Sequence, residues 1–173
     1  MAGIALAQLA GEVDHGRALI ERSLALTPNS ASAWIASSFM HGEIGDTVTA
    51  LAHFENAQRL NPLDSIHHFQ WLAAGFAHFA AGRYEKAAAA IDKTLMANPA
   101  YVPAIRLKVS VCGLLGQLAE GAQWVRRLRE AIPTASVFQL SIFWRAPLAH
   151  NGGVLAKLVE GARLAGLPHQ SVR

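Results

Sequence analysis

The chain has 173 residues, of which 52% are apolar and only 16% charged, and its formal net charge is +3. This length is enough for one domain with a sizeable core, but no uninterrupted apolar run reaches the ~18 residues that a membrane-spanning helix needs. The basic residues are scattered, apart from Arg126, Arg127 and Arg129, and the single cysteine, Cys112, excludes an internal disulfide. We therefore expect a protein of a reducing compartment that binds no nucleic acid.

The first ten residues, Met1 to Ala10, are apolar and rich in alanine, with no basic residue ahead of the apolar stretch. A secretory signal peptide would begin with basic residues. Since none is present, we interpret the segment as a helix and expect a cytoplasmic protein. Ile4, Leu6 and Leu9 would leave apolar surface exposed at this end. Either the sequence is part of a longer protein or this end self-associates, and we predict a homodimer through it.

Two residue types recur along the chain with one common period. Intervals of 34, 37 and 34 residues separate the prolines Pro28, Pro62, Pro99 and Pro133. The same intervals separate the glycines Gly11, Gly45, Gly82 and Gly116. Five residues after each glycine comes a small residue, and four residues further on a large apolar one. These two positions share one helix face, so a neighbouring helix can approach closely there.

This period predicts repeated pairs of antiparallel helices. The first helix of a pair ends near the glycine, which permits a tight turn, and the second ends before the proline, which cannot continue a helix. One pair cannot bury its apolar face alone. Successive pairs should therefore stack into a superhelix with a concave and a convex side.

The pattern resembles the tetratricopeptide repeat (TPR) family. The unit at 31–64 has the family's signature residues Trp34, Gly45, Asp46, Ala50, Phe54, Ala57, Asn61 and Pro62. A partial unit at about 1–30 precedes it, and units at 65–101 and 102–135 follow. The resemblance implies an all-α fold, a right-handed superhelix of antiparallel hairpins, with a protein or peptide as the partner.

The repeat ends after Pro133, and we expect 136–173 to hold an irregular segment followed by a C-terminal capping helix. From Val154 to Ala165 apolar residues recur with helical spacing, and Lys157, Glu160 and Arg163 supply a polar outer face. The stretch 158–168 is similar to the tail of TPR regions in bacterial class III adenylate/guanylate cyclases and winged-helix regulators. This similarity implies a regulatory or scaffolding tail of such a protein.

In the TPR family the first helix of each pair lines the concave groove. Carried over to this chain, the candidate groove residues are Phe39, Glu43, Phe69, Leu72, Phe76, Phe79, Arg106 and Ser110. Members that bind chaperone tails hold a terminal carboxylate with Lys, Asn and Arg, but these places are mostly apolar here and only Arg106 could serve. An apolar groove suits an amphipathic helix or a hydrophobic peptide instead. Alternatively these aromatic residues form the core, or the segment from Phe138 to Trp144 folds back and occupies the groove.

The sequence offers little for catalysis or for a metal or other cofactor. The eight histidines include no i, i+4 pair with a third ligand nearby. The pair Gly152 and Gly153 lacks the strand and the lysine of a phosphate loop, and Cys112 lies on an apolar stretch where an inert, buried thiol is expected. We therefore predict a non-enzymatic interaction module without a cofactor. The alternative is a dimerisation scaffold for a cyclase or transcription regulator.

Overall fold

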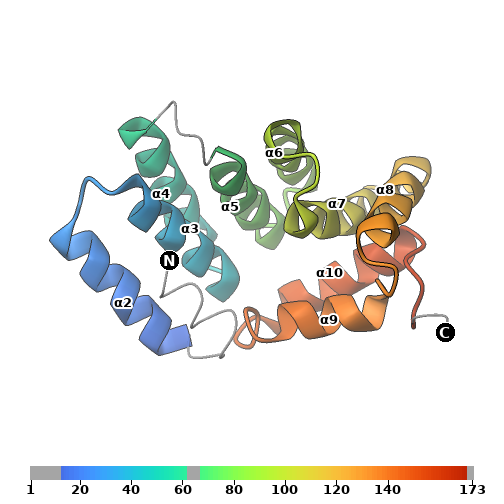
Figure 1. The fold of residues 1–173 in the computed structure, drawn as a ribbon. Helices are drawn as coiled ribbons and strands as arrows, with labels where there is room; N and C mark the ends of the chain where they lie inside the picture. Colours follow the sequence, from blue (N-terminus) through green and yellow to red (C-terminus); the bar gives the residue numbers. More distant parts are fainter. Residues whose placement is uncertain (1–12, 62–66, 171–173) are drawn as a thin grey trace.

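The computed structural model describes residues 13–61 and 67–170, and these ranges contain helices and no strand. Three antiparallel pairs follow one another and form the curved array of Figure 1. They are α3 (Ala31–Ile44) with α4 (Thr47–Leu60), α5 (His67–Ala80) with α6 (Tyr84–Ala97), and α7 (Val102–Leu114) with α8 (Leu118–Ala131). The helix α2 (Val13–Leu26) precedes them, and α9 (Val137–Arg145) and α10 (Gly152–Leu164) follow. The expected N-terminal helix and the dimer contact through it fall within 1–12, outside the described residues.

The turns inside the pairs follow from the periodic glycines. Gly45, Gly82 and Gly116 have φ angles of 92°, 72° and 70°, a left-handed conformation that side chains with a Cβ atom rarely adopt. The Asp46 carboxylate then accepts a hydrogen bond from the Thr49 N–H group at 3.1 Å and begins α4. Ser30 caps α3 in the same way, through the Ala33 N–H group. The predicted all-α hairpin fold is confirmed.

A buried cation ties the last repeated pair to the pair before it. The Lys108 side chain on α7 is only 4% exposed, and its Nζ lies 2.7 Å from Asp92 Oδ1 on α6 and 3.1 Å from Glu120 Oε1 on α8. Burial alone would lower the pKa of Lys108, but the hydrogen bonds to both carboxylates outweigh it and raise the pKa. A buried charge needs such partners, so this ion pair holds three helices in register.

The segment after the repeats, expected to be irregular, contains the helix α9. The Ser136 hydroxyl accepts a hydrogen bond from the Gln139 N–H group at 3.2 Å and caps its first turn. Val137, Leu140 and Trp144 bury one side of the helix. The prediction of an irregular segment is therefore wrong for 137–145. The three apolar residues pack against the rest of the fold, and the repeat pattern does not indicate this contact.

The helix α10 packs against α7 more extensively than α8 does, and α9 lies beside α10 (Figure 1). Gly113 on α7 and Gly161 on α10 allow this close approach. A Cβ atom added at Gly113 would overlap the carbonyl oxygen of Gly161, and one added at Gly161 would overlap that of Ser110. The Ser110 hydroxyl donates a hydrogen bond of 2.8 Å to the Leu158 carbonyl oxygen in the same contact. Lys157, Glu160 and Arg163 are exposed on the outer face of α10, as expected for a capping helix.

Among the described residues, no helix combines the length and the apolar character that crossing a bilayer requires.

Replacing Gly113 by alanine should separate α7 from α10, because backbone atoms cannot move aside as a flexible side chain can. We expect the free energy of unfolding to fall by about 2 kcal/mol or more, as in other overpacked cores, measured by urea denaturation followed by circular dichroism. The matched control is Gly153→Ala on α10, where an added Cβ meets no atom within 4 Å. That variant should be as stable as the wild type, and equal stability of both variants would contradict the close α7–α10 contact.

Candidate functional site

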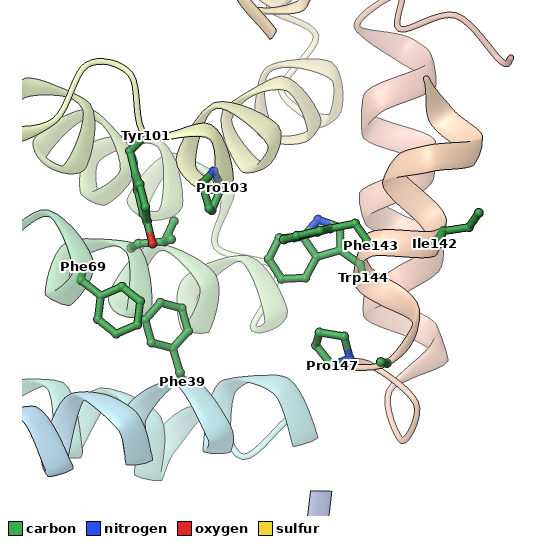
Figure 2. A pocket seen from close by; sticks show the side chains of 10 residues that line it. Phe39, Phe69, Tyr101, Pro103, Ile142, Phe143, Trp144 and Pro147 are labelled. Atoms are coloured by element: carbon green, nitrogen blue, oxygen red, sulfur yellow. The ribbon is translucent and has the colours of Figure 1, made fainter. Parts of the chain in front are cut away.

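An apolar pocket of about 320 Å³ lies between the first helices of the three pairs and the helix α9 (Figure 2). No charged side chain lines it. The lining residues are Phe39, Phe69, Leu72, Tyr101, Pro103, Ile142, Phe143, Trp144, Ala146 and Pro147.

One wall of the pocket consists of aromatic and aliphatic side chains from α3, α5 and the start of α7. The rings of Phe39 and Phe69 are tilted against each other with their centroids 4.6 Å apart, and Leu72 lies one turn further along α5. The helix α7 packs only slightly on α5, whereas α5 packs extensively on α3. The first helices therefore diverge at this point. Tyr101 and Pro103 border the space between them, and burial raises the pKa of the Tyr101 hydroxyl.

The opposite wall comes from α9 and the turn after it. The Trp144 ring stacks on Phe76 of α5, with centroids 5.1 Å apart and an interplanar angle of 22°. Phe143 stands edge-on to Trp144 at 5.1 Å and lies across the pocket from Phe39 and Phe69 in Figure 2. The Trp144 indole N–H is buried without a hydrogen-bond acceptor among the described residues. This wall thus buries the tryptophan and leaves Phe143 41% exposed.

The predicted groove residues divide into three sets. Phe39, Phe69 and Leu72 line the pocket. Phe76 and Phe79 are 1% and 0% exposed, Phe76 beneath Trp144 and Phe79 against Tyr84, and neither lines the pocket. The other three residues do not line the pocket. Glu43 is buried on α3, Ser110 donates a hydrogen bond to α10, and Arg106 contacts the ring of Phe143.

Arg106 contacts the pocket lining through Phe143. Its Cζ atom lies 4.0 Å from the centroid of the Phe143 ring, a cation–π geometry. The side chain is half-buried, and burial lowers its pKa. Within the described part of the chain the guanidinium group has no acidic partner.

The sequence reasoning did not single out Tyr101, Ala146 and Pro147 as site residues. Tyr101 precedes α7, and Ala146 and Pro147 lie in the turn between α9 and α10, so none of them occupies a groove position of a repeat. The available signal was the aromatic cluster at Phe143 and Trp144, which follows the end of the repeats.

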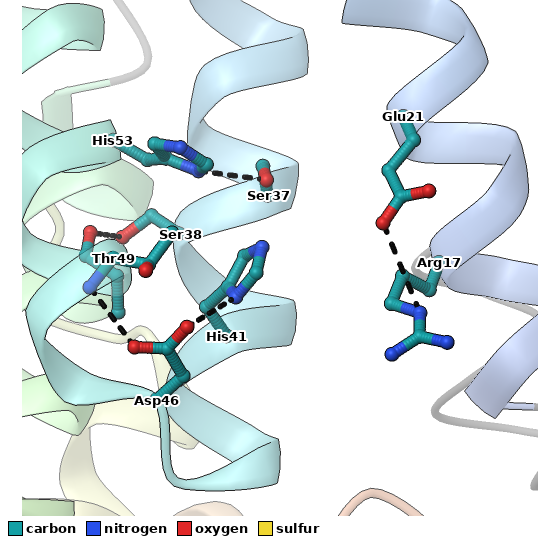
Figure 3. A network of polar contacts seen from close by, with 9 residues as sticks. Arg17, Glu21, Ser37, Ser38, His41, Asp46, Thr49 and His53 are labelled. Carbon is teal, nitrogen blue, oxygen red and sulfur yellow. Dashed lines mark hydrogen bonds and ion pairs between the residues drawn. The ribbon is translucent and has the colours of Figure 1, made fainter.

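A cluster of polar side chains between α3 and α4 does not form a catalytic arrangement (Figure 3). Ser37 and His53 Nδ1 are 2.8 Å apart, and His41 Nδ1 lies 3.3 Å from Asp46 Oδ2. The serine and the aspartate therefore contact different imidazoles, whereas a catalytic triad needs one imidazole between them. Burial lowers the pKa of His53, and the nearby His41 lowers it further. The residues that the structure describes contain no group of three side chains able to hold a metal ion.

No protein-family model and no curated protein matches the sequence. The structure is similar to that of PilW, a type IV pilus biogenesis factor, with 18% identity, a TM-score of 0.69 and coverage of 90% of this chain and 72% of PilW. It is similar to TTC0263, a TPR protein of Thermus thermophilus, with 18% identity, a TM-score of 0.67 and coverage of 90% and 84%. YrrB, described as a TPR protein with an unusual peptide-binding site, has 15% identity, a TM-score of 0.56 and coverage of 93% and 82%. The fold is therefore that of a TPR solenoid.

Because Phe79 is fully buried, its replacement should act on stability. We expect Phe79→Ala to lower the free energy of unfolding by about 4 kcal/mol, the usual cost of removing a buried phenylalanine. The matched control is Phe138→Ala on α9, whose side chain is 53% exposed and should contribute less than about 1 kcal/mol. Chemical denaturation of the two variants measures the difference, and a Phe79→Ala protein of wild-type stability would contradict the burial of this ring.

Proposed function

We propose that the chain is a protein–protein interaction module that takes an apolar segment of a partner into the pocket between α3, α5, α7 and α9. The observation that carries this proposal is the pocket itself, an apolar space of about 320 Å³ with no charged residue in its lining. This volume is at the low end of the range for ligand pockets. It suits one or two large side chains of a peptide, while the rest of the peptide follows the surface.

The composition of the walls supports the same reading. Phe39, Phe69 and Phe143 present rings to the space, and aromatic side chains are enriched at the centres of protein interfaces because they bury much apolar area. Similarity to TPR solenoids is in keeping with a role in binding. We propose no enzymatic activity, since the pocket lining offers neither a nucleophile nor a general base beyond the Tyr101 hydroxyl.

A second proposal follows from the position of α9. The helix contributes Ile142, Phe143 and Trp144 to the pocket wall, and it leaves the side chains of Phe138 and Ile142 about half exposed. These features favour a dimerisation scaffold in which α9 is itself the groove's occupant and its outer face contacts a second chain. The predicted homodimer through the N-terminal segment stays a separate proposal.

Two phenylalanines of α9 offer a matched test of the binding proposal, because Phe143 lines the pocket and Phe138 does not. Peptides selected from a random displayed library against the wild type should contain a large apolar residue. Phe143→Ala should weaken their binding at least about tenfold, equivalent to about 1.4 kcal/mol, and Phe138→Ala less than about twofold, measured by fluorescence anisotropy.

The same samples test the scaffold proposal by light scattering. A monomer whose peptide binding depends on Phe143 supports the interaction module. A dimer that dissociates on Phe138→Ala and selects no peptide supports the scaffold and contradicts the interaction module.

We further propose that the module is the cytoplasmic regulatory tail of a larger bacterial signalling protein. The support is the similarity of 158–168 to the tails of cyclases and winged-helix regulators. Leu158, Ala162, Ala165 and Leu167 of this stretch are buried in the fold, so packing demands also contribute to the similarity. An immunoblot of the source cells should detect a protein much heavier than 18.5 kDa, and a band at that mass would contradict the proposal.

A further inference from the structure

Two histidines meet in the interface between α3 and α4 (Figure 3). The rings of His41 on α3 and His53 on α4 are nearly perpendicular, with their centroids 5.1 Å apart, and both side chains are partly buried. Trp34 also packs against His53, with ring centroids 4.8 Å apart. Histidine is the side chain whose charge changes near neutral pH. This interface therefore holds two such groups in direct contact.

The two imidazoles differ in what surrounds them. Asp46 Oδ2 lies 3.3 Å from the buried Nδ1 atom of His41, so a proton on His41 creates an ion pair. His53 Nδ1 instead lies 2.8 Å from Ser37 Oγ. A hydroxyl group can donate or accept a hydrogen bond, so this contact favours neither charge state of His53. A first proton is therefore compensated at His41, and a second one at His53 is not.

The environment of His53 opposes its protonation. Burial is the main cause of its lowered pKa, the nearby His41 lowers the pKa further, and Asp46 opposes both without reversing the direction. A base whose pKa is lower in the folded state binds its proton more readily when the chain unfolds. The stability that the neutral imidazole contributes is complete above the ordinary histidine pKa of about 6.5. It is lost as the pH falls below that value.

The neighbouring helices α2 and α5 bring no free carboxylate to this interface. On the α2 side, Arg17 already pairs with two carboxylates of its own helix (Figure 3). The described side chains of α5 include no Asp, Glu, Lys or Arg. Its His68 packs against Tyr101, and its His78 lies near the basic residues that begin α6. A second charge in the interface thus gains no partner from either helix.

The acidic residues of α3 and α4 themselves point elsewhere. Glu43 and Glu55 each lie two residues from a histidine of the pair, and side chains with this spacing point about 200° apart on a helix. The turn before α10 reaches Gly45 through the uncharged Asn151, and the neighbouring His150 is exposed. Asp46 is therefore the acid that this interface supplies within the described residues.

We propose that the α3–α4 pair is an acid-sensitive element, which loosens in mildly acidic solution when both His41 and His53 take up protons. The first proton forms the ion pair with Asp46, and the second places two like charges in contact in a partly buried interface. This inference does not depend on the proposed function. The helix α3 also carries Phe39 of the pocket lining, so loosening of the pair displaces one side of the pocket.

Hydrogen exchange of the full chain, measured by mass spectrometry and corrected for the intrinsic exchange rate, tests the proposal. The measurements are made at about pH 7.5 and about pH 5.5, on either side of the ordinary histidine pKa. We expect the protection of 31–60 to fall at least about tenfold more on acidification than that of 102–131. The α7–α8 pair in 102–131 contains no histidine and is the internal control. Equal loosening of both pairs, or none, overturns the proposal.

His53→Gln supplies the decisive variant, because its amide can still bond to Ser37 but cannot take up a proton. Its acid response in 31–60 should be lost, whereas the matched control His150→Gln, at an exposed position, should keep the wild-type response. A folded His53→Gln protein with the full response overturns the proposal. If thermal denaturation shows this variant to be unfolded at neutral pH, an NMR titration of the wild-type imidazoles decides instead. Titration of His53 at or above about pH 6.5 overturns the proposal, and titration below it supports it.

Discussion

The contact between α7 and α10 fixes the end of the array, because the two helix backbones meet where neither has a side chain. Gly113 faces the Gly161 carbonyl, and Gly161 faces that of Ser110. At this distance, rotation or sliding of either helix would bring a Cβ atom into the contact. The hydrogen bond from Ser110 to Leu158 fixes the register further. A short turn joins α10 to α9, so the position of α9 follows from this contact.

The start of α9 is tied to the same assembly. The N–H groups of Val137 and Phe138 donate to the carbonyl oxygens of Pro168 and His169, at 2.8 and 3.2 Å. With both of its ends held, α9 places Trp144 on Phe76 and Phe143 beside Arg106. The pocket is the space that remains between this fixed helix and the diverging first helices. Its shape therefore depends on a contact between α7 and α10 that lies outside the pocket lining.

The sequence predicts the repeated part of this fold well, because the information there is local. Two local signals mark each hairpin. One is the glycine with a positive φ angle in the turn, at Gly45, Gly82 and Gly116. The other is the proline that ends the second helix. The irregular segment was mispredicted at α9 because its apolar spacing has no counterpart in the repeats. The repeat register alone left open whether Phe76 lines the groove or belongs to the core, because Trp144, which covers it, comes from beyond the last repeat. Phe39, Phe69 and Leu72, which the repeat register alone assigns to the groove face, line the pocket.

Electrostatics divide α7 into two sides with different roles. Two residues apart on a helix, Arg106 and Lys108 point about 200° apart, so one can face the groove while the other faces α6 and α8. On the outer side the ammonium group of Lys108 is a compact charge that two carboxylates neutralise, and it holds the second helices together. On the inner side a planar guanidinium group rests on the face of Phe143. Exchanging the two residues would leave a strongly hydrated ammonium group beside Phe143. The choice of arginine at 106 thus allows a cation to lie against an aromatic ring that lines an apolar pocket.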